Sequence, residues 1–181
     1  MRPVAWTLFT VLLLSFEGPL LRHVDRWWLA PDLLVLAALY LGSRCSWLVG
    51  LSCAAAIGLW KDAFSLAAPV GTFVEIGTLL CAATSLLGNR LDLRSTLPTM
   101  AAAGGATFAA VGLFLLFQAL FHRNFGAFDE VLRAAPPMAL GTMLAAPVVF
   151  WIYDRIGDVL SRGDRIGALP DRRRDGLRRT R

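Results

Sequence analysis

Long apolar stretches separated by short polar turns occupy most of this 181-residue chain. A helix that crosses the hydrocarbon core of a bilayer, about 30 Å thick, needs roughly 20 mainly apolar residues. The pattern therefore predicts an all-α polytopic membrane protein with about six transmembrane helices. The predicted spans are Pro3–Leu21, Pro31–Leu41, Trp47–Trp60, Val70–Leu87, Leu97–Leu120 and Pro136–Tyr153.

Local signals set several of these boundaries. The run Glu17–Pro19 is expected to break the far end of the first helix, and Pro31 suits the first position of the second, which is short for a complete crossing. Phe121–Leu132 places apolar residues at helical spacing opposite charged ones, a pattern typical of a short helix lying in the membrane interface. Pro147 predicts a kink in the last helix.

Composition supports the membrane assignment, since 56% of the residues are hydrophobic and only 17% are charged. The net charge of +5 belongs to the end of the chain, where Arg155–Arg181 hold nine arginines against four aspartates. By the positive-inside rule, an even number of spans then places both termini in the cytoplasm. We expect one transmembrane domain over residues 1–157 and a basic tail over 158–181, which binds anionic lipids rather than nucleic acid. Leu169–Arg181 is expected to be disordered.

With this topology, charged residues gather in the outer half of the membrane. An ionisable side chain costs roughly 2.5 to 3.5 kcal/mol at the centre of a spanning helix, so such residues are expected to face a cavity, a partner or one another. The candidate cluster consists of Glu17, Asp32, Lys61, Asp62, Glu75 and Gln118. We expect it to form an outward-facing cavity or a partner-binding face.

Some members of this cluster have simpler explanations. Asp32 stands in a first helical turn, where a carboxylate favours the positive end of the helix dipole. Lys61 has a side chain long enough to reach the membrane interface, with Asp62 merely its neighbour. Glu75 lies between Val74 and Ile76, which favours a paired or cavity-facing carboxylate.

Small residues at four-residue spacing predict close helix packing on two helices. These residues are Gly50, Ala54 and Gly58 on one helix and Ala101, Gly105 and Ala109 on the other. Cys45, Cys53 and Cys81 lack the spacing of a zinc site or a disulfide framework and are expected to be packing residues.

Catalytic motifs are missing from the sequence. It contains no Gly-x-Ser-x-Gly, no His-Glu-x-x-His and no glycine-rich phosphate loop, and the two histidines, His23 and His122, stand in different predicted loops. We therefore expect neither an enzyme nor a bound metal or cofactor.

Three motifs occur in order: Pro31-Asp32 before an apolar run, Gly58-x-x-x-Asp62, and Pro69-x-Gly71. Together with the length and the number of spans, they resemble MreD, the rod shape-determining membrane protein. The resemblance covers about Pro31–Arg94 and extends to five motif positions, Pro31, Asp32, Asp62, Pro69 and Gly71. Lys61 and Glu75 depart from the family pattern.

The resemblance implies a non-enzymatic component of the cell-elongation machinery in the bacterial inner membrane. Its implied partners are an MreC-type membrane protein, the RodA glycosyltransferase, a class B penicillin-binding protein and, at least indirectly, the MreB filament. The alternative is a substrate-binding S component of an energy-coupling-factor vitamin transporter, which has a similar length, six helices and an outward-facing pocket. Such a transporter binds a vitamin, whereas a scaffold binds the transmembrane helix of another protein.

Overall fold

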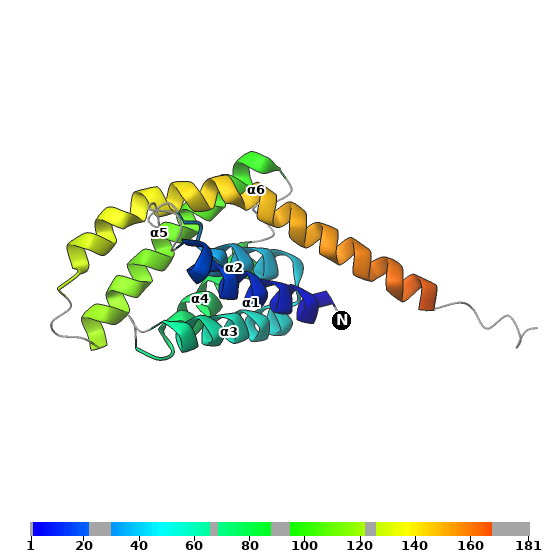
Figure 1. Cartoon of the computed structure of the whole chain (residues 1–181), viewed down its shortest axis with the longest axis horizontal. Coiled ribbons are helices and arrows are strands. Elements are labelled where there is room, and N and C mark those ends of the chain that lie inside the picture. The colour runs from blue at the N-terminus through cyan, green and yellow to red at the C-terminus, as the bar shows by residue number, and fades with distance from the viewer. Residues whose placement is uncertain (1, 22–29, 66–68, 88–94, 122–125, 168–181) are drawn as a thin grey trace, which may run out of the picture.

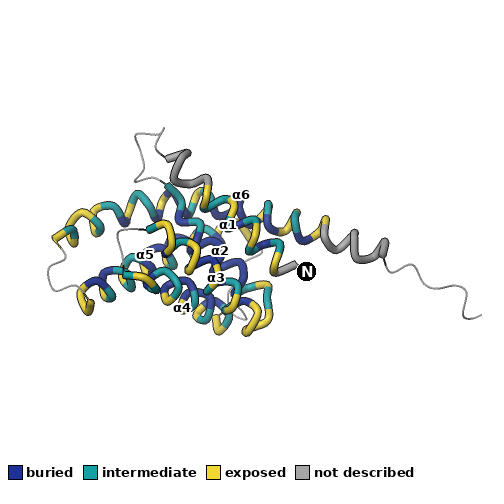
Figure 2. The backbone as a smooth tube through the Cα atoms, turned by 60° about the horizontal axis from the view of Figure 1, so that its bottom comes forward, coloured by how far each residue is buried: buried dark blue, intermediate teal, exposed yellow. Residues whose placement is uncertain are grey.

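The shortest helix, α2 (Leu33–Arg44), lies at the centre of the molecule and contacts the other five helices that the structure describes. Every residue from Leu34 to Gly42 is buried (Figure 2). A helix that is apolar on all sides is stable only where apolar groups surround it, and here the neighbouring helices supply those groups. Its 12 residues rise only about 18 Å, so α2 is shorter than the bilayer core.

The structure is a computed structural model that describes residues 2–21, 30–65, 69–87, 95–121 and 126–167. The described residues form helices and no strand, which confirms the all-α prediction. The helices around α2 are α1 (Arg2–Leu21), α3 (Trp47–Phe64), α4 (Thr72–Leu87), α5 (Thr96–Phe121) and α6 (Phe128–Gly167).

Helices α3 and α4 pack closely along the predicted face of small residues. Gly50, Ala54 and Gly58 are all buried, and a Cβ atom placed on Gly50 would lie 3.3 Å from the sulfur of Cys81 in α4. Helix α1 lies against α3 and α6. Helices α5 and α6 form a hairpin beside this group, and the C-terminal part of α6 projects past the other helices (Figure 1).

In the part of the chain that the structure describes, three helices are long and apolar enough to cross a membrane: Trp47–Phe64, Thr96–Phe121 and Phe128–Val159. Within the described residues, Val4–Ser15, Leu33–Arg44 and Thr72–Leu87 are apolar but shorter. These lengths fit an integral membrane protein. The six-span topology stays a prediction.

Three boundary predictions were wrong. Helix α1 continues through Glu17–Pro19 to Leu21, and α6 begins at Phe128 rather than at Pro136. Of the stretch predicted as a separate interfacial helix, Phe121–Leu132, the helical residues that the structure describes belong to the end of α5 and the beginning of α6. Proline is tolerated inside membrane helices, where neighbouring helices and local adjustments satisfy the backbone groups that it frees. Pro19 in α1 and Pro136 in α6 therefore do not mark helix ends.

Helix α6 is the longest element and curves along its length (Figure 1). It contains Pro147 and continues to Gly167, so the domain boundary predicted at residue 157 lies inside a helix. The stretch expected to be disordered, Leu169–Arg181, lies outside the described residues.

Candidate functional site

Asp32 holds the beginning of α2 in place. Its Oδ1 atom accepts hydrogen bonds from the backbone N–H groups of Leu34 at 3.1 Å and Val35 at 3.4 Å. A helix begins with four backbone donors that lack partners inside the helix, and an N-cap aspartate satisfies some of them. The N–H of Asp32 itself donates to Oγ1 of Thr142 in α6 at 3.0 Å. One residue thus connects the beginning of α2 to α6.

Lys61, in the last turn of α3, pairs with this carboxylate. Its Nζ atom lies 2.9 Å from Oδ1 of Asp32 and 4.9 Å from the ring centroid of Phe73. The side chain of Lys61 is 21% exposed and that of Asp32 is 8% exposed, so both charges are largely shielded from solvent. Lys61 therefore turns toward Asp32 within the protein.

Asp62, the next residue, caps a different helix. Its two carboxylate oxygens accept hydrogen bonds from the N–H groups of Phe73 and Val74, each at 3.1 Å, in the first turn of α4. Asp62 is 5% exposed. A carboxylate in this place satisfies two free donors and lies at the positive end of the α4 dipole, so Asp62 is not a solvated helix end.

Two glycines of the motifs make this arrangement possible. A Cβ atom on Gly58 would lie 2.6 Å from both the carbonyl oxygen of Phe73 and the Cα of Val74, so only glycine lets the first turn of α4 come this close to α3. Gly71 has a φ of 105°, a conformation that other residues rarely adopt. Thr72 donates both its N–H and its hydroxyl to the carbonyl oxygen of Pro69. The Gly58-x-x-x-Asp62 and Pro69-x-Gly71 motifs therefore form one joint between α3 and α4.

A partly open cavity of about 210 Å³ lies beside the ion pair. Asp32 and Lys61 are its only charged lining residues among those that the structure describes, and the rest of the lining is apolar. The lining comes from α2 to α6: Asp32, Leu34, Lys61, Phe73, Ile76, Ala110, Val111, Phe114, Val131 and Met138. The rings of Phe73 and Phe114 stack with their centroids 6.1 Å apart.

The other members of the predicted cluster lie elsewhere. Glu75 is exposed in the first turn of α4 and does not line the cavity. Gln118 is buried in α5, at 1% exposure, and is also absent from the cavity lining. Glu17 belongs to α1, but its side chain lies outside the described residues. The structure therefore brings together Asp32, Lys61 and Asp62.

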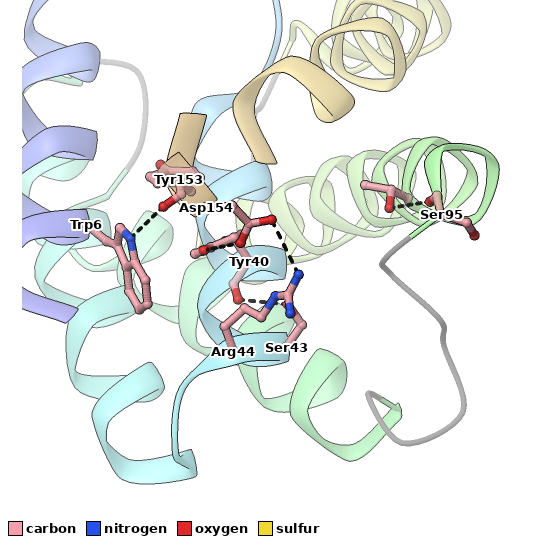
Figure 3. A network of polar contacts seen from close by, with 8 residues as sticks. Trp6, Tyr40, Ser43, Arg44, Ser95, Tyr153 and Asp154 are labelled. Carbon is pink, nitrogen blue, oxygen red and sulfur yellow. Dashed lines mark hydrogen bonds and ion pairs between the residues drawn. The ribbon is translucent and has the colours of Figure 1, made fainter. Parts of the chain in front are cut away.

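Sequence reasoning missed a polar network at the opposite end of α2 (Figure 3). The hydroxyl of Tyr40 in α2 donates to Oδ1 of Asp154 in α6 at 2.8 Å, and Arg44 pairs with Oδ2 of Asp154 at 3.5 Å. More than 100 residues separate these partners in the chain, so no local pattern links them. The sequence did offer a weaker indication of this network. Two tyrosines, Tyr40 and Tyr153, and two opposite charges, Arg44 and Asp154, stand near the predicted cytoplasmic ends of their helices.

Aromatic side chains extend this network to α1. The indole N–H of Trp6 donates to the carbonyl oxygen of Tyr153 at 3.0 Å, and the hydroxyls of Thr10 and Tyr153 are hydrogen-bonded. The rings of Tyr40 and Tyr153 stack at 4.7 Å, and Trp6 packs edge-on against Tyr40 at 5.2 Å. The network fixes the crossing of α1, α2 and α6.

The three cysteines, all within the described residues, form no disulfide. Cys81 is buried, and Cys45 and Cys53 are half-buried. Burial raises the pKa of Cys45, in the turn after α2, to about 11, so its thiol is protonated at neutral pH. Among the described residues, no group of three histidines, cysteines or carboxylates could hold a metal ion.

No family model, curated protein or solved structure matches the chain. The structure alone therefore defines a protein whose described residues form helices and no strand, with three of these helices long enough to span a membrane.

Proposed function

We propose that this protein is a non-enzymatic membrane scaffold of the bacterial cell-elongation machinery, similar to MreD. It crosses the inner membrane six times with both termini in the cytoplasm. It binds an MreC-type protein and, through it or beside it, RodA and a class B penicillin-binding protein. MreB is a more distant partner on the cytoplasmic side.

One observation carries the proposal. The motif residues that suggested the family lie in a single structural unit at one end of the bundle: Asp32 caps α2, Asp62 caps α4, and Gly71 forms the turn before α4. Three short motifs, each common alone, thus have a shared structural reason for their order and spacing.

The cavities of the structure favour a scaffold over the vitamin transporter, the first by its size and the second by its lining. Sites for drug-sized molecules usually have about 300 to 1,000 Å³ and bury most of the ligand. The cavity beside Asp32 and Lys61 has about 210 Å³ and only two charged lining residues within the described chain. A space of this size fits one side chain of a partner better than a whole vitamin. A larger cavity, of about 570 Å³, lies between α2, α4 and α5, but none of its described lining residues is charged, so it offers no ionic group to orient a polar vitamin.

The direct test uses cells depleted of this protein. We expect loss of rod shape on depletion, rescue by the unaltered chain, and recovery of the MreC-type protein with a tagged chain purified in detergent. A panel of vitamins should leave the thermal unfolding of the purified protein unchanged, because saturation at 100 times the dissociation constant adds about 2.7 kcal/mol of stability. Normal cell shape after depletion together with a clear shift for one vitamin would replace the scaffold by the transporter.

A further inference from the structure

Within the described residues, one oxygen of the Asp32 carboxylate, Oδ2, accepts no hydrogen bond. All its side-chain hydrogen bonds, from Leu34, Val35 and Lys61, end on Oδ1. Among the residues that the structure describes, none donates to Oδ2. Asp32 is 94% buried, because only 6% of its surface is exposed, and it lines the cavity. Oδ2 is therefore a charged acceptor beside a partly open, mainly apolar cavity, and a ligand donor that reaches it gains a charge-assisted hydrogen bond.

The two charges that line the cavity favour a ligand whose hydrogen-bond donor is neutral. Lys61 already lies 2.9 Å from Asp32, so the two lining charges offset each other. A cation at Oδ2 would be placed close to the Lys61 ammonium, and an anion would be placed close to the Asp32 carboxylate. A hydroxyl or ring N–H avoids both repulsions.

The size and lining of the cavity select an aromatic body. An apolar cavity of about 150 Å³ holds one benzene molecule, and this cavity has about 210 Å³. Its lining includes the stacked rings of Phe73 and Phe114 and the flexible side chain of Met138. Aromatic rings pack well against aromatic and thioether groups. A ring with one polar donor therefore satisfies both the space and the unused acceptor.

We propose that this cavity receives one tyrosine or tryptophan side chain from a membrane-embedded segment of a partner protein, with its O–H or N–H donated to Oδ2 of Asp32. Tyrosine and tryptophan are enriched among the residues that dominate protein interfaces, where they fill desolvated pockets. The choice of a protein as the source rests on the proposed scaffold function. The chemistry of the cavity rests on the structure alone.

The first test measures the chemistry with side-chain analogues. Purified protein in lipid nanodiscs is titrated with p-cresol, 3-methylindole and toluene, and binding is followed by thermal unfolding. We expect p-cresol or 3-methylindole to bind about tenfold more tightly than toluene, the value of one good hydrogen bond to a charged group. Asp32→Asn keeps an oxygen for the α2 cap but offers an N–H₂ group in place of Oδ2, so this preference should disappear. Equal binding of all three analogues to the unaltered protein would overturn the proposal.

A second pair of variants tests occupancy independently of Asp32. Val111→Phe places a ring in the cavity from α5, whereas Leu116→Phe, on an exposed part of the same helix, does not line it. We expect Val111→Phe to abolish analogue binding and to reduce recovery of the MreC-type protein at least tenfold, with Leu116→Phe unchanged in both. If Val111→Phe blocks the analogues but partner recovery stays normal, the occupant is not a partner side chain. If even the unaltered chain recovers no MreC-type protein, the proposed function fails while the analogue result still decides the chemistry.

Discussion

The two ends of α2 each carry an ion pair, but the two pairs have different surroundings. At the beginning of the helix, Asp32 and Lys61 are mostly buried and lie 2.9 Å apart. At its end, Arg44 and Asp154 are 32% and 51% exposed and lie 3.5 Å apart. Removing one partner of a buried ion pair strongly destabilises the folded protein, because it leaves an unpaired buried charge, whereas an exposed ion pair contributes little to stability. The difference indicates that charge fixes the Asp32 end, while aromatic packing fixes the Arg44 end.

Removal of the buried cation should give the largest effect. Lys61→Met keeps most of the side-chain volume but leaves the Asp32 carboxylate without its counter-charge, which should lower the free energy of unfolding by about 3 to 5 kcal/mol. The measurement is equilibrium unfolding in detergent, with Lys61→Arg as the charge-retaining control. A loss below about 1 kcal/mol would mean that the pair is solvated and that the contrast between the two ends does not exist.

Asp62→Leu should come next. It leaves the N–H groups of Phe73 and Val74 without acceptors, and each unsatisfied buried donor costs about 1 to 3 kcal/mol. The matched control is Glu75→Leu, an exposed carboxylate in the first turn of α4, for which we expect a change within about 0.5 kcal/mol. Equal effects of the two substitutions on thermal unfolding would show that the cap is unimportant.

Two glycine substitutions should have opposite signs. Gly71→Ala forces an alanine into a φ of 105° and should destabilise by about 1 to 2 kcal/mol. In Gly105→Ala, the added methyl group has no atom within 4 Å beyond its own neighbouring stretch of helix, and alanine is the better helix former, so this variant of α5 should be more stable by about 0.5 to 1 kcal/mol. Thermal unfolding of both variants checks the signs. Destabilisation by Gly105→Ala would indicate that another helix covers this face of α5.

Sequence patterns located the helices well but not their partners. The starts of α2 to α5 fall within about two residues of the predicted ones, since apolar periodicity and turn residues are local signals. Lys61 and Asp62 were placed at the correct helix end. That Lys61 pairs with Asp32 of the α2 cap, whereas Asp62 caps α4, depends on where α2 and α4 lie in space. Asp32 pairs with Lys61 across 29 positions, and Tyr40 bonds Asp154 across 114. Neither pairing leaves a pattern within one helix.

The errors at the helix ends have a common cause. The predicted ends of two helices fell at prolines, Pro19 in the first helix and Pro136 in the last, and proline commonly ends a helix in water. In this protein α1 continues past Pro19 to Leu21, and Pro136 lies inside α6. Membrane helices tolerate proline because neighbouring helices, side chains, ordered waters or local backbone adjustments can satisfy the groups that it frees. The same environment explains α2, whose 12 residues are too few for a bilayer crossing but are enclosed by other helices.

The smallest expected effect tests the comparison of the two ion pairs most sharply. Arg44→Gln removes the exposed pair with Asp154, and exposed pairs contribute about 0.2 to 1 kcal/mol. Tyr40 still donates to Asp154 in this variant, so the α2–α6 crossing should persist. Salt screens exposed charges, with a Debye length of about 3 Å at 1 M ionic strength, but screens buried pairs much less. In unfolding experiments at low and at 1 M salt, the loss from Arg44→Gln should disappear at high salt, whereas the loss from Lys61→Met should remain. If both losses fall by the same fraction, the Asp32–Lys61 pair is open to ions, and its cavity is not the shielded site that a partner side chain requires.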